Sequence, residues 1–200
     1  MKNQTKWSID VSHSQLAFKV KHLMISNIKG VFKTFEAVIL TTGDDFSTAQ
    51  IDVRIDTASL DTGDMKRDYH LKGQDFFDFR HHKHITFSGT NLVKSQSEGD
   101  MELWGNLTIK GISKQIKLIV EYGGMIKDLQ GNKKVGFIIT GKLNRKDWQL
   151  NWNTLLETGG FMVGDEVIIN CEILVTKSLT KEIEKIYSLY KKEQVAQITY

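Results

Sequence analysis

The sequence predicts an all-β protein, an extended eight-stranded antiparallel β-barrel with a short helical excursion near residues 64–78 and a C-terminal helix. Apolar and polar residues alternate with period two through most of the chain, as in Ile51–Ile55, which indicates strands with one buried face. Turn residues separate these runs at hairpin distances, which favours antiparallel pairing. Several runs exceed the usual five or six residues, and long strands in such an array favour a tall closed barrel that can hold one small ligand.

The strands are expected, in chain order, at 14–22, 27–41, 49–57, 84–93, 100–110, 114–123, 133–145 and 165–177, with a further short strand at 6–10. The runs are separated by turns such as Gly43–Asp45, Lys110–Gly111 and Gly131–Asn132, whose residue types favour tight reversals. The strands therefore account for almost all of residues 1–177, which we expect to form one domain.

Two regions depart from the β pattern. Residues 64–72 have helical composition, and Asp75–Asp78 is expected to add a second short helical turn. In 178–200, apolar residues recur at helical spacing after Ser178, a suitable N-cap, which predicts an amphipathic helical extension. That helix could pack on the barrel, mediate a homodimer or touch a membrane surface.

Composition and charge exclude several classes of protein. The formal net charge of +3 gives no reason to expect nucleic acid as a partner, and 40% hydrophobic residues exclude a disordered chain. Cys171 is the one cysteine, so neither an intramolecular disulfide nor a cysteine-based zinc site is expected. No run approaches the roughly 20 apolar residues of a transmembrane segment, and no signal peptide is apparent. We therefore expect a cytoplasmic protein, or a periplasmic one if a signal was removed.

Several ordered sequence blocks are similar to the YceI-like family of bacterial lipid-binding barrels. They are spread over about residues 6–177, in family order. The blocks are Trp7–Asp10 with His13-Ser14, Lys21–Met24 with Gly30 and Phe32, Arg67–Leu71, Asp75–Asp78, Ile85–Phe87, Gly105–Gly111, and Asn144–Asp147 with Trp152-Asn153 and Gly164–Val167. The chain departs from the family pattern at Val11 and His84, where proline is usual, and at Trp148-Gln149, where Phe-Gly is common.

The resemblance implies a lipocalin-like architecture that holds a polyisoprenoid, of quinone or prenyl phosphate type, or a related fatty-acyl lipid. Such a protein would act as a carrier, store or buffer, with the lipid as its ligand and no required cofactor. The departure at Trp148-Gln149 leaves the size of the ligand open.

Candidate ligand-binding residues fall into two groups. The expected hydrophobic lining is aromatic and aliphatic, although an ordinary packed core would use the same residue types. It comprises Phe18, Val20, Phe32, Phe35, Leu71, Phe76, Phe77, Phe87, Phe137, Trp148 and Trp152. The expected head-group or rim residues are His22, Arg67, Asp68, His70, Asn144 and Arg145. As alternatives, Arg67 and Asp68 could form a structural pair, and the polar residues at 144–153 could simply stabilise turns.

Metal and catalytic arrangements are weakly indicated. His81, His82 and His84 lack a placed carboxylate, so a solvated loop is favoured over a metal site. Asp10, Ser12 and His13 are adjacent in sequence, which does not create a catalytic triad. Cys171 alternates with apolar neighbours and is expected to be a small buried hydrophobe.

We therefore predict a non-catalytic lipid carrier, and two alternatives remain open. One is an enzyme that acts on such a lipid, with His22, Arg67 and His70 as candidates. The other is a stress-response interaction protein with a packed barrel and no ligand.

Overall fold

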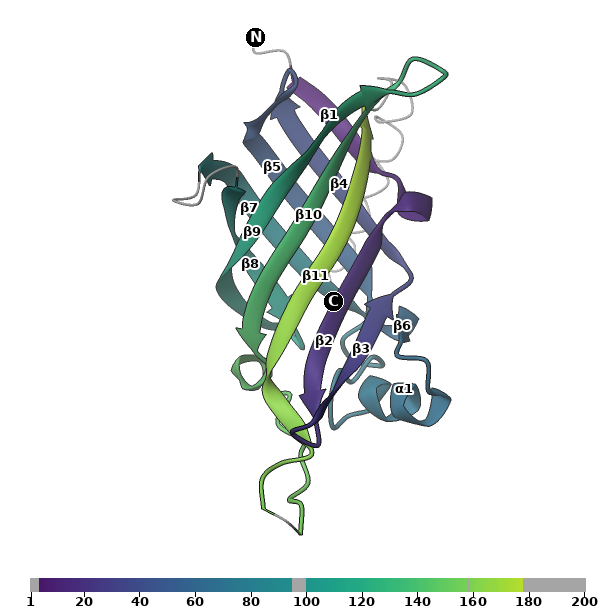
Figure 1. Ribbon diagram of the computed structural model, residues 1–200, viewed down its shortest axis with the longest axis vertical. Helices are drawn as coiled ribbons and strands as arrows, with labels where there is room; N and C mark the ends of the chain where they lie inside the picture. The colour runs from purple at the N-terminus through teal and green to yellow at the C-terminus, as the bar shows by residue number, and fades with distance from the viewer. Residues whose placement is uncertain (1–3, 95–99, 158, 178–200) are drawn as a thin grey trace, which may run out of the picture.

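A computed structural model describes residues 4–94, 100–157 and 159–177 as one barrel with a single α-helix (Figure 1). The strands are β1 (Gln4–Ile9), β2 (Gln15–His22), β3 (Ser26–Phe32), β4 (Phe35–Thr42), β5 (Asp45–Asp56), β6 (Leu60–Asp61), β7 (His84–Lys94), β8 (Asp100–Ile109), β9 (Ile112–Lys127), β10 (Lys133–Asn144) and β11 (Val163–Lys177). Helix α1 spans Met65–Lys72, and short 3₁₀ turns occupy Val11–His13, Thr57–Ser59 and Arg145–Trp148.

Eight of these strands close into an antiparallel barrel. The ring runs β1-β4-β5-β7-β8-β9-β10-β11, and β1 pairs with β11 to complete it. The long strand β11 pairs with β1 only near its C-terminal end, while its earlier residues pair with β2. The predicted eight-stranded antiparallel barrel is therefore confirmed.

The strand predicted at 27–41 is wrong in one respect, because the chain breaks there into β3 and β4. β3 pairs with β2 and briefly with β6, whereas β4 pairs with β1 and β5. At the break the backbone of Lys33 and Thr34 bonds to Ser59 and Asp56, at 3.2 and 2.9 Å. The chain thus exchanges its strand partners at Lys33-Thr34. As a result, residues 26–30 of β3 pair with β2 on one side and with no strand on the other.

The helical excursion is confirmed for α1 but not for Asp75–Asp78. Asp64 caps the helix, because its carboxylate accepts hydrogen bonds from the backbone N–H groups of Lys66 and Arg67 at 2.9 and 3.1 Å. Residues 75–78 form hydrogen-bonded turns rather than a helix, and Asp78 has a left-handed φ of 47°. The helix predicted in 178–200 lies outside the described residues.

The two ends of the barrel are filled differently. At the upper end of Figure 1, near the β4–β5 turn and the β9–β10 hairpin, aromatic rings pack the interior. Trp7 is fully buried, its indole N–H donates to Thr41 Oγ1 at 2.9 Å, and its ring lies 4.8 Å from that of Phe46. Phe46 in turn contacts Phe137 at 5.0 Å between ring centres. The upper end is therefore a packed core, and the free space lies below it.

Candidate functional site

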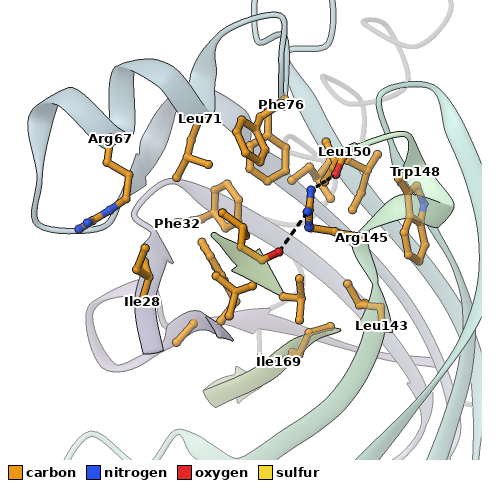
Figure 2. A pocket seen from close by; sticks show the side chains of 18 of the residues that line it. Ile28, Phe32, Arg67, Leu71, Phe76, Leu143, Arg145, Trp148, Leu150 and Ile169 are labelled. Atoms are coloured by element: carbon orange, nitrogen blue, oxygen red, sulfur yellow. Dashed lines mark hydrogen bonds between the residues drawn. The ribbon is translucent and has the colours of Figure 1, made fainter. Parts of the chain in front are cut away.

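An apolar cavity of about 450 Å³ occupies the lower half of the barrel (Figure 2). Its walls come from β2, β3, β10 and β11, from α1, and from the segments that follow α1 and β10. The lining includes Phe18, Val20, Ile28, Phe32, Leu71, Phe76, Phe77, Leu107, Leu143, Trp148, Trp152, Met162 and Ile169. Alternation produces much of this wall, since Leu16, Phe18 and Val20 line the cavity from β2 whereas Lys19 and Lys21 do not.

A second, smaller space of about 150 Å³ lies further up the barrel. It shares the wall residues Leu16, Ile55, Leu107, Ile169 and Cys171 with the main cavity, so the two spaces adjoin. All of its lining residues are apolar or cysteine. Together they provide an apolar tube that ends against the aromatic core.

The cavity reaches the surface at the lower end, beside α1, because its lining includes the exposed side chain of Lys66. Residues 26–30 of β3 have no strand neighbour on that side, and α1 spans the gap. Ile28 from β3 and Arg67 from α1 both belong to the lining, and Figure 2 shows them at the same side of the cavity. We call this opening the portal.

All the ionisable side chains of the lining, cysteine apart, are basic, and they lie toward the lower end. They are His22, Lys66, Arg67, His70 and Arg145. The upper space has none. The cavity therefore combines an apolar interior with a basic, more polar end, and this arrangement suits an amphiphile rather than a pure hydrocarbon.

Arg145 is buried, with 3% of its surface exposed, and bonds mainly to backbone carbonyls. Its Nε donates to Gly164 O at 2.9 Å, and its two terminal nitrogens donate to the carbonyls of Leu150, Trp152 and Val163 and to the Asp165 carboxylate. Burial lowers the pKa of the guanidinium, which Asp165 partly offsets. These five bonds match the five N–H donors of arginine, so Arg145 holds the 149–164 segment in place and has no donor left for a ligand.

Arg67 and Asp68 do not pair with each other, so the structural pair weighed above is wrong. Both side chains bind Thr62 instead. Arg67 Nε donates to Thr62 Oγ1 at 2.7 Å, and the Thr62 hydroxyl and backbone N–H both donate to Asp68, at 2.6 and 2.9 Å. Arg67 also lies 3.9 Å from the Asp64 carboxylate. The two residues therefore anchor α1 to the strand end, although Arg67 still contributes to the cavity lining.

The two candidate histidines differ in their surroundings. His70 Nε2 lies 3.1 Å from the Asp75 carboxylate, and the imidazole packs edge-on against Trp152 and Phe76 at 4.6 and 5.3 Å. His22 ends β2 and lines the cavity, and its side chain makes no hydrogen bond to the described residues. Lys66 likewise makes no side-chain ion pair within this part of the chain. His22 and Lys66 are therefore the lining groups best able to meet a polar head group.

Most of the sequence-predicted lining residues reach a cavity wall. Eight line the main cavity, namely Phe18, Val20, Phe32, Leu71, Phe76, Phe77, Trp148 and Trp152. Phe87 and Phe137 line the upper space, and Phe35 is buried without lining either. Of the predicted head-group residues, His22, Arg67, His70 and Arg145 line the main cavity. Asp68 and Asn144 do not, and Asn144 instead accepts a hydrogen bond from the Lys146 backbone at 3.0 Å.

Sequence reasoning missed Lys66, Ile28, Met162 and the wall shared by the two spaces. Ile28 and Phe32 have the same strand phase, so the alternation in β3 could have indicated Ile28. Lys66 lies beside the predicted Arg67 in the same helix. Met162 lies in an irregular segment, where no periodicity indicates which way a side chain points.

No metal-binding cluster is found within residues 4–94, 100–157 and 159–177. His81 pairs with Asp78 at 3.0 Å, while His84 bonds to Arg54. Asp10, Ser12 and His13 do lie together, but the same nitrogen of His13, Nδ1, lies 3.0 Å from both the Asp10 and the Ser12 oxygens. A triad needs the two ring nitrogens to face different partners, so this cluster is a local side-chain hydrogen-bond group and not a triad.

Cys171 is buried, as expected, and lines both spaces. Desolvation raises the pKa of its thiol to about 11, against a weaker opposing effect of a backbone hydrogen bond at Ala17. The thiol is therefore protonated at neutral pH and is not a nucleophile in this state.

The fold and the cavity define a class of protein, the hollow antiparallel β-barrel of lipocalin-like architecture. The description "YceI-like domain" matches residues 7–175, and the chain belongs to the YceI-like family. A UPF0312 protein of Staphylococcus aureus strain MSSA476 is 40% identical over 164 residues, which cover 82% of this chain and 92% of that protein. The relative from strain N315 is 38% identical over the same shares.

Solved structures show the same barrel. The YCEI protein of Campylobacter jejuni superposes with a TM-score of 0.66 at 34% identity, covering 80% of this chain and 90% of that one. Burkholderia cenocepacia BcnA gives 0.71 at 22% identity over 83% and 98%. A polyisoprenoid binding domain from Saccharophagus degradans gives 0.60 at 16% identity over 86% and 98%. The last two likenesses concern the fold. In the described part of the chain, no helix has the length and apolar character needed to cross a membrane.

Proposed function

We propose that this protein binds one long-chain amphiphile inside the barrel and acts as its carrier, without covalent chemistry. The observation that carries this proposal is the cavity of about 450 Å³, which adjoins the apolar upper space and gathers its basic groups at the portal end. Burial of each CH₂ group contributes about 0.8 kcal/mol, so a chain that fills this tube needs few polar contacts to bind well.

The ligand that fits best is a polyisoprenoid of quinone or prenyl phosphate type, and a fatty-acyl lipid is the related alternative. Family membership and the name of the Saccharophagus degradans domain support this choice. In the proposed pose the chain lies along Phe18, Phe32 and Ile169, and the head group meets His22 and Lys66 at the portal. No cofactor is needed for this role.

Native mass spectrometry of freshly purified protein, followed by organic extraction, tests the proposal. A discrete mass shift that extracts as a polyprenyl or acyl lipid is the expected result. A clean apo mass, together with failure of added prenyl and acyl lipids to bind, would overturn it.

A matched pair of variants ties binding to the cavity. Ile169 lines both spaces, whereas Ile168 is its neighbour with the opposite strand phase and lies opposite Lys19 on β2. Ile169→Phe should fill the tube and weaken lipid binding, while Ile168→Phe adds the same volume outside the cavity and should leave binding unchanged. Equal binding by both variants would place the lipid elsewhere.

A further inference from the structure

Five apolar side chains lie exposed together at the lower end of the barrel. Leu23, Met24 and Ile25 form the β2–β3 turn, with 37%, 59% and 86% of their surfaces exposed. Leu155 and Phe161, at 72% and 48%, belong to the segment between β10 and β11. We call these five residues the apolar tip. In Figure 1 the β2–β3 turn lies at the lower rim of the barrel, and the segment between β10 and β11 extends below it.

The two halves of the tip are joined. The Leu23 backbone N–H donates to Met162 O at 2.8 Å, and a Cβ atom at Gly160 would lie 3.7 Å from the Met24 side chain. Leu155 and Phe161 form a β-bridge with each other, so their segment is itself a small hairpin. The apolar tip is therefore one surface rather than five scattered residues, and scattered apolar residues alone would need no explanation.

The backbone of the turn is unfavourable for the residues that occupy it. Leu23 and Met24 have left-handed φ values of 51° and 63°, a region that asparagine and glycine occupy far more readily. Met24 gains little burial in return, because 59% of its surface is exposed. Leucine and methionine at these positions are thus costly for folding, which points to a role outside the chain.

Basic residues lie directly behind the tip. Lys19, Lys21 and Lys29 alternate with the cavity-lining residues of β2 and β3, so they face outward, and Lys19 lies opposite Lys29. None of the three makes an ion pair with a described residue, and like charges opposite each other are unfavourable in a sheet. We call these three residues the lysine face.

Two of the four acidic residues near the tip are neutralised by lysines. Asp165 pairs with Lys146 at 2.8 Å, and Glu166 pairs with Lys142 at 3.3 Å. Asp147 and Glu157 make no ion pair within the described part of the chain. The lysine face therefore complements a negatively charged partner beside an apolar one, and both properties occur together at the surface of an anionic bilayer.

We propose that the apolar tip and the lysine face dock the protein on an anionic lipid bilayer. The tip would enter the headgroup region, and the lysines would meet the lipid phosphates. The location adds a reason, since Ile25 directly precedes β3, the strand that forms one edge of the portal. Docking places the portal at the membrane, where an apolar guest could pass without crossing water. The surface interaction itself does not require a guest in the barrel.

Vesicle flotation tests the proposal with neutral phosphatidylcholine vesicles and with vesicles that also contain phosphatidylglycerol. The full chain should float with the anionic vesicles and much less with the neutral ones, and added salt should weaken binding. The double variant Leu23→Asn/Met24→Gly should reduce binding about tenfold because it removes two apolar side chains. This variant should fold at least as stably as the original, since its residues suit the left-handed turn.

The matched control lies at the opposite end of the barrel. Ile126 and Leu129, at 65% and 103% exposed, are as exposed as the tip residues and belong to the β9–β10 hairpin. The double variant Ile126→Ser/Leu129→Ser should float as the original does. The triple variant Lys19→Gln/Lys21→Gln/Lys29→Gln should lose the preference for anionic vesicles.

Three results would overturn the proposal. The first is flotation that the tip variant does not change. The second is equal binding to neutral and anionic vesicles, which removes the role of the lysine face. The third is concentration-dependent self-association in sedimentation velocity that the tip variant abolishes, without vesicle binding, because the tip would then join two copies of the chain. Lipid loading from organic solvent is measured separately on the same variants, so a failure of the carrier function is distinguishable from a failure of docking.

Discussion

The ring of Phe18 on β2 lies directly over Gly30 on β3, where a Cβ atom would come 2.7 Å from ring Cε1. The two residues are cross-strand neighbours in the β2–β3 pair. Glycine therefore lets the aromatic ring lie flat on the cavity wall instead of projecting into the cavity. The free space in the lower barrel depends in part on this one missing side chain.

Gly30→Val should reduce lipid binding more than it reduces stability. The added side chain displaces the Phe18 ring, which is half-buried and can turn into the adjoining cavity. We expect a loss of about 1–3 kcal/mol in the free energy of unfolding, as for other overpacked sites. Displacement of a fluorescent fatty acid and urea unfolding measure the two effects.

The control for this variant is Gly105→Val on β8. A Cβ atom there would lie 2.7 Å from the backbone oxygen of Ser88 and 2.6 Å from the Phe87 ring. Because backbone cannot turn aside as a ring can, this variant should lose clearly more stability than Gly30→Val. A smaller loss at Gly105 than at Gly30 would contradict the explanation.

Arg145→Met should be among the most destabilising single changes in the chain. It removes the guanidinium donor of the Leu150, Trp152 and Gly164 carbonyls in a buried setting, while the Val163 carbonyl keeps the Asn153 side-chain amide as a donor. Removing one partner from such a buried charged contact lowers the free energy of unfolding by about 3–5 kcal/mol. Arg145→Lys should not restore this stability, because an ammonium group lacks the planar set of donors of a guanidinium. Urea unfolding measures the loss, and limited proteolysis should show faster cleavage within 149–163.

The matched control is Lys146→Met, one residue away. Lys146 is 45% exposed and pairs with Asp165 at the surface. Exposed ion pairs contribute about 0–1 kcal/mol, so this variant should remain close to the original protein. Comparable losses at 145 and 146 would show that the segment does not depend on the buried guanidinium.

Cys171 should make stability fall at alkaline pH. Its folded pKa of about 11 lies above the ordinary thiol pKa of 9.0 that applies to the unfolded chain. A group with a raised folded pKa contributes its stability fully below the unfolded pKa and loses it as pH rises through the folded pKa, here between about 9 and 11. Reversible urea unfolding at about pH 8 and pH 10.5 should show a decline that Cys171→Ala lacks. If the free energy of unfolding falls equally with pH in the original protein and in Cys171→Ala, the thiol is not responsible for the decline.

The alternation of apolar residues was sufficient to predict the closed barrel, because one buried face per strand leaves few other architectures. The same signal placed Phe18, Val20 and Phe32 on a cavity wall. It did not show which strands the two halves pair with, although the inward phase shifts at Lys33-Thr34, from Ile28 and Phe32 in β3 to Ala37 and Ile39 in β4. The portal follows from that break, and therefore sequence reasoning did not locate it.

The polar residues were harder to assign than the apolar ones. Arg67 and Arg145 were candidates for a head group because a guanidinium suits an anion, and Asp68 was a candidate as a polar group beside Arg67. Their bonds are made to Thr62 and to distant backbone carbonyls, which are brought together only by the tertiary fold. Residue type indicated the chemistry of each side chain. The number of hydrogen-bond donors that remain free for a ligand depends on contacts between distant segments.

Lys66 should contribute to the binding of anionic guests only. It is the exposed basic residue of the cavity lining, it makes no ion pair with a described residue, and it lies at the portal where the head group is proposed to lie. A partly exposed charged contact is worth about 0.5–1.5 kcal/mol, so Lys66→Gln should weaken binding of a prenyl phosphate about threefold to tenfold. Binding of the corresponding prenyl alcohol should not change. Lys72→Gln, at the other end of the same helix and outside the main cavity lining, is the matched control. Equal losses for the phosphate and the alcohol would mean that Lys66 shapes the portal instead of meeting a charge.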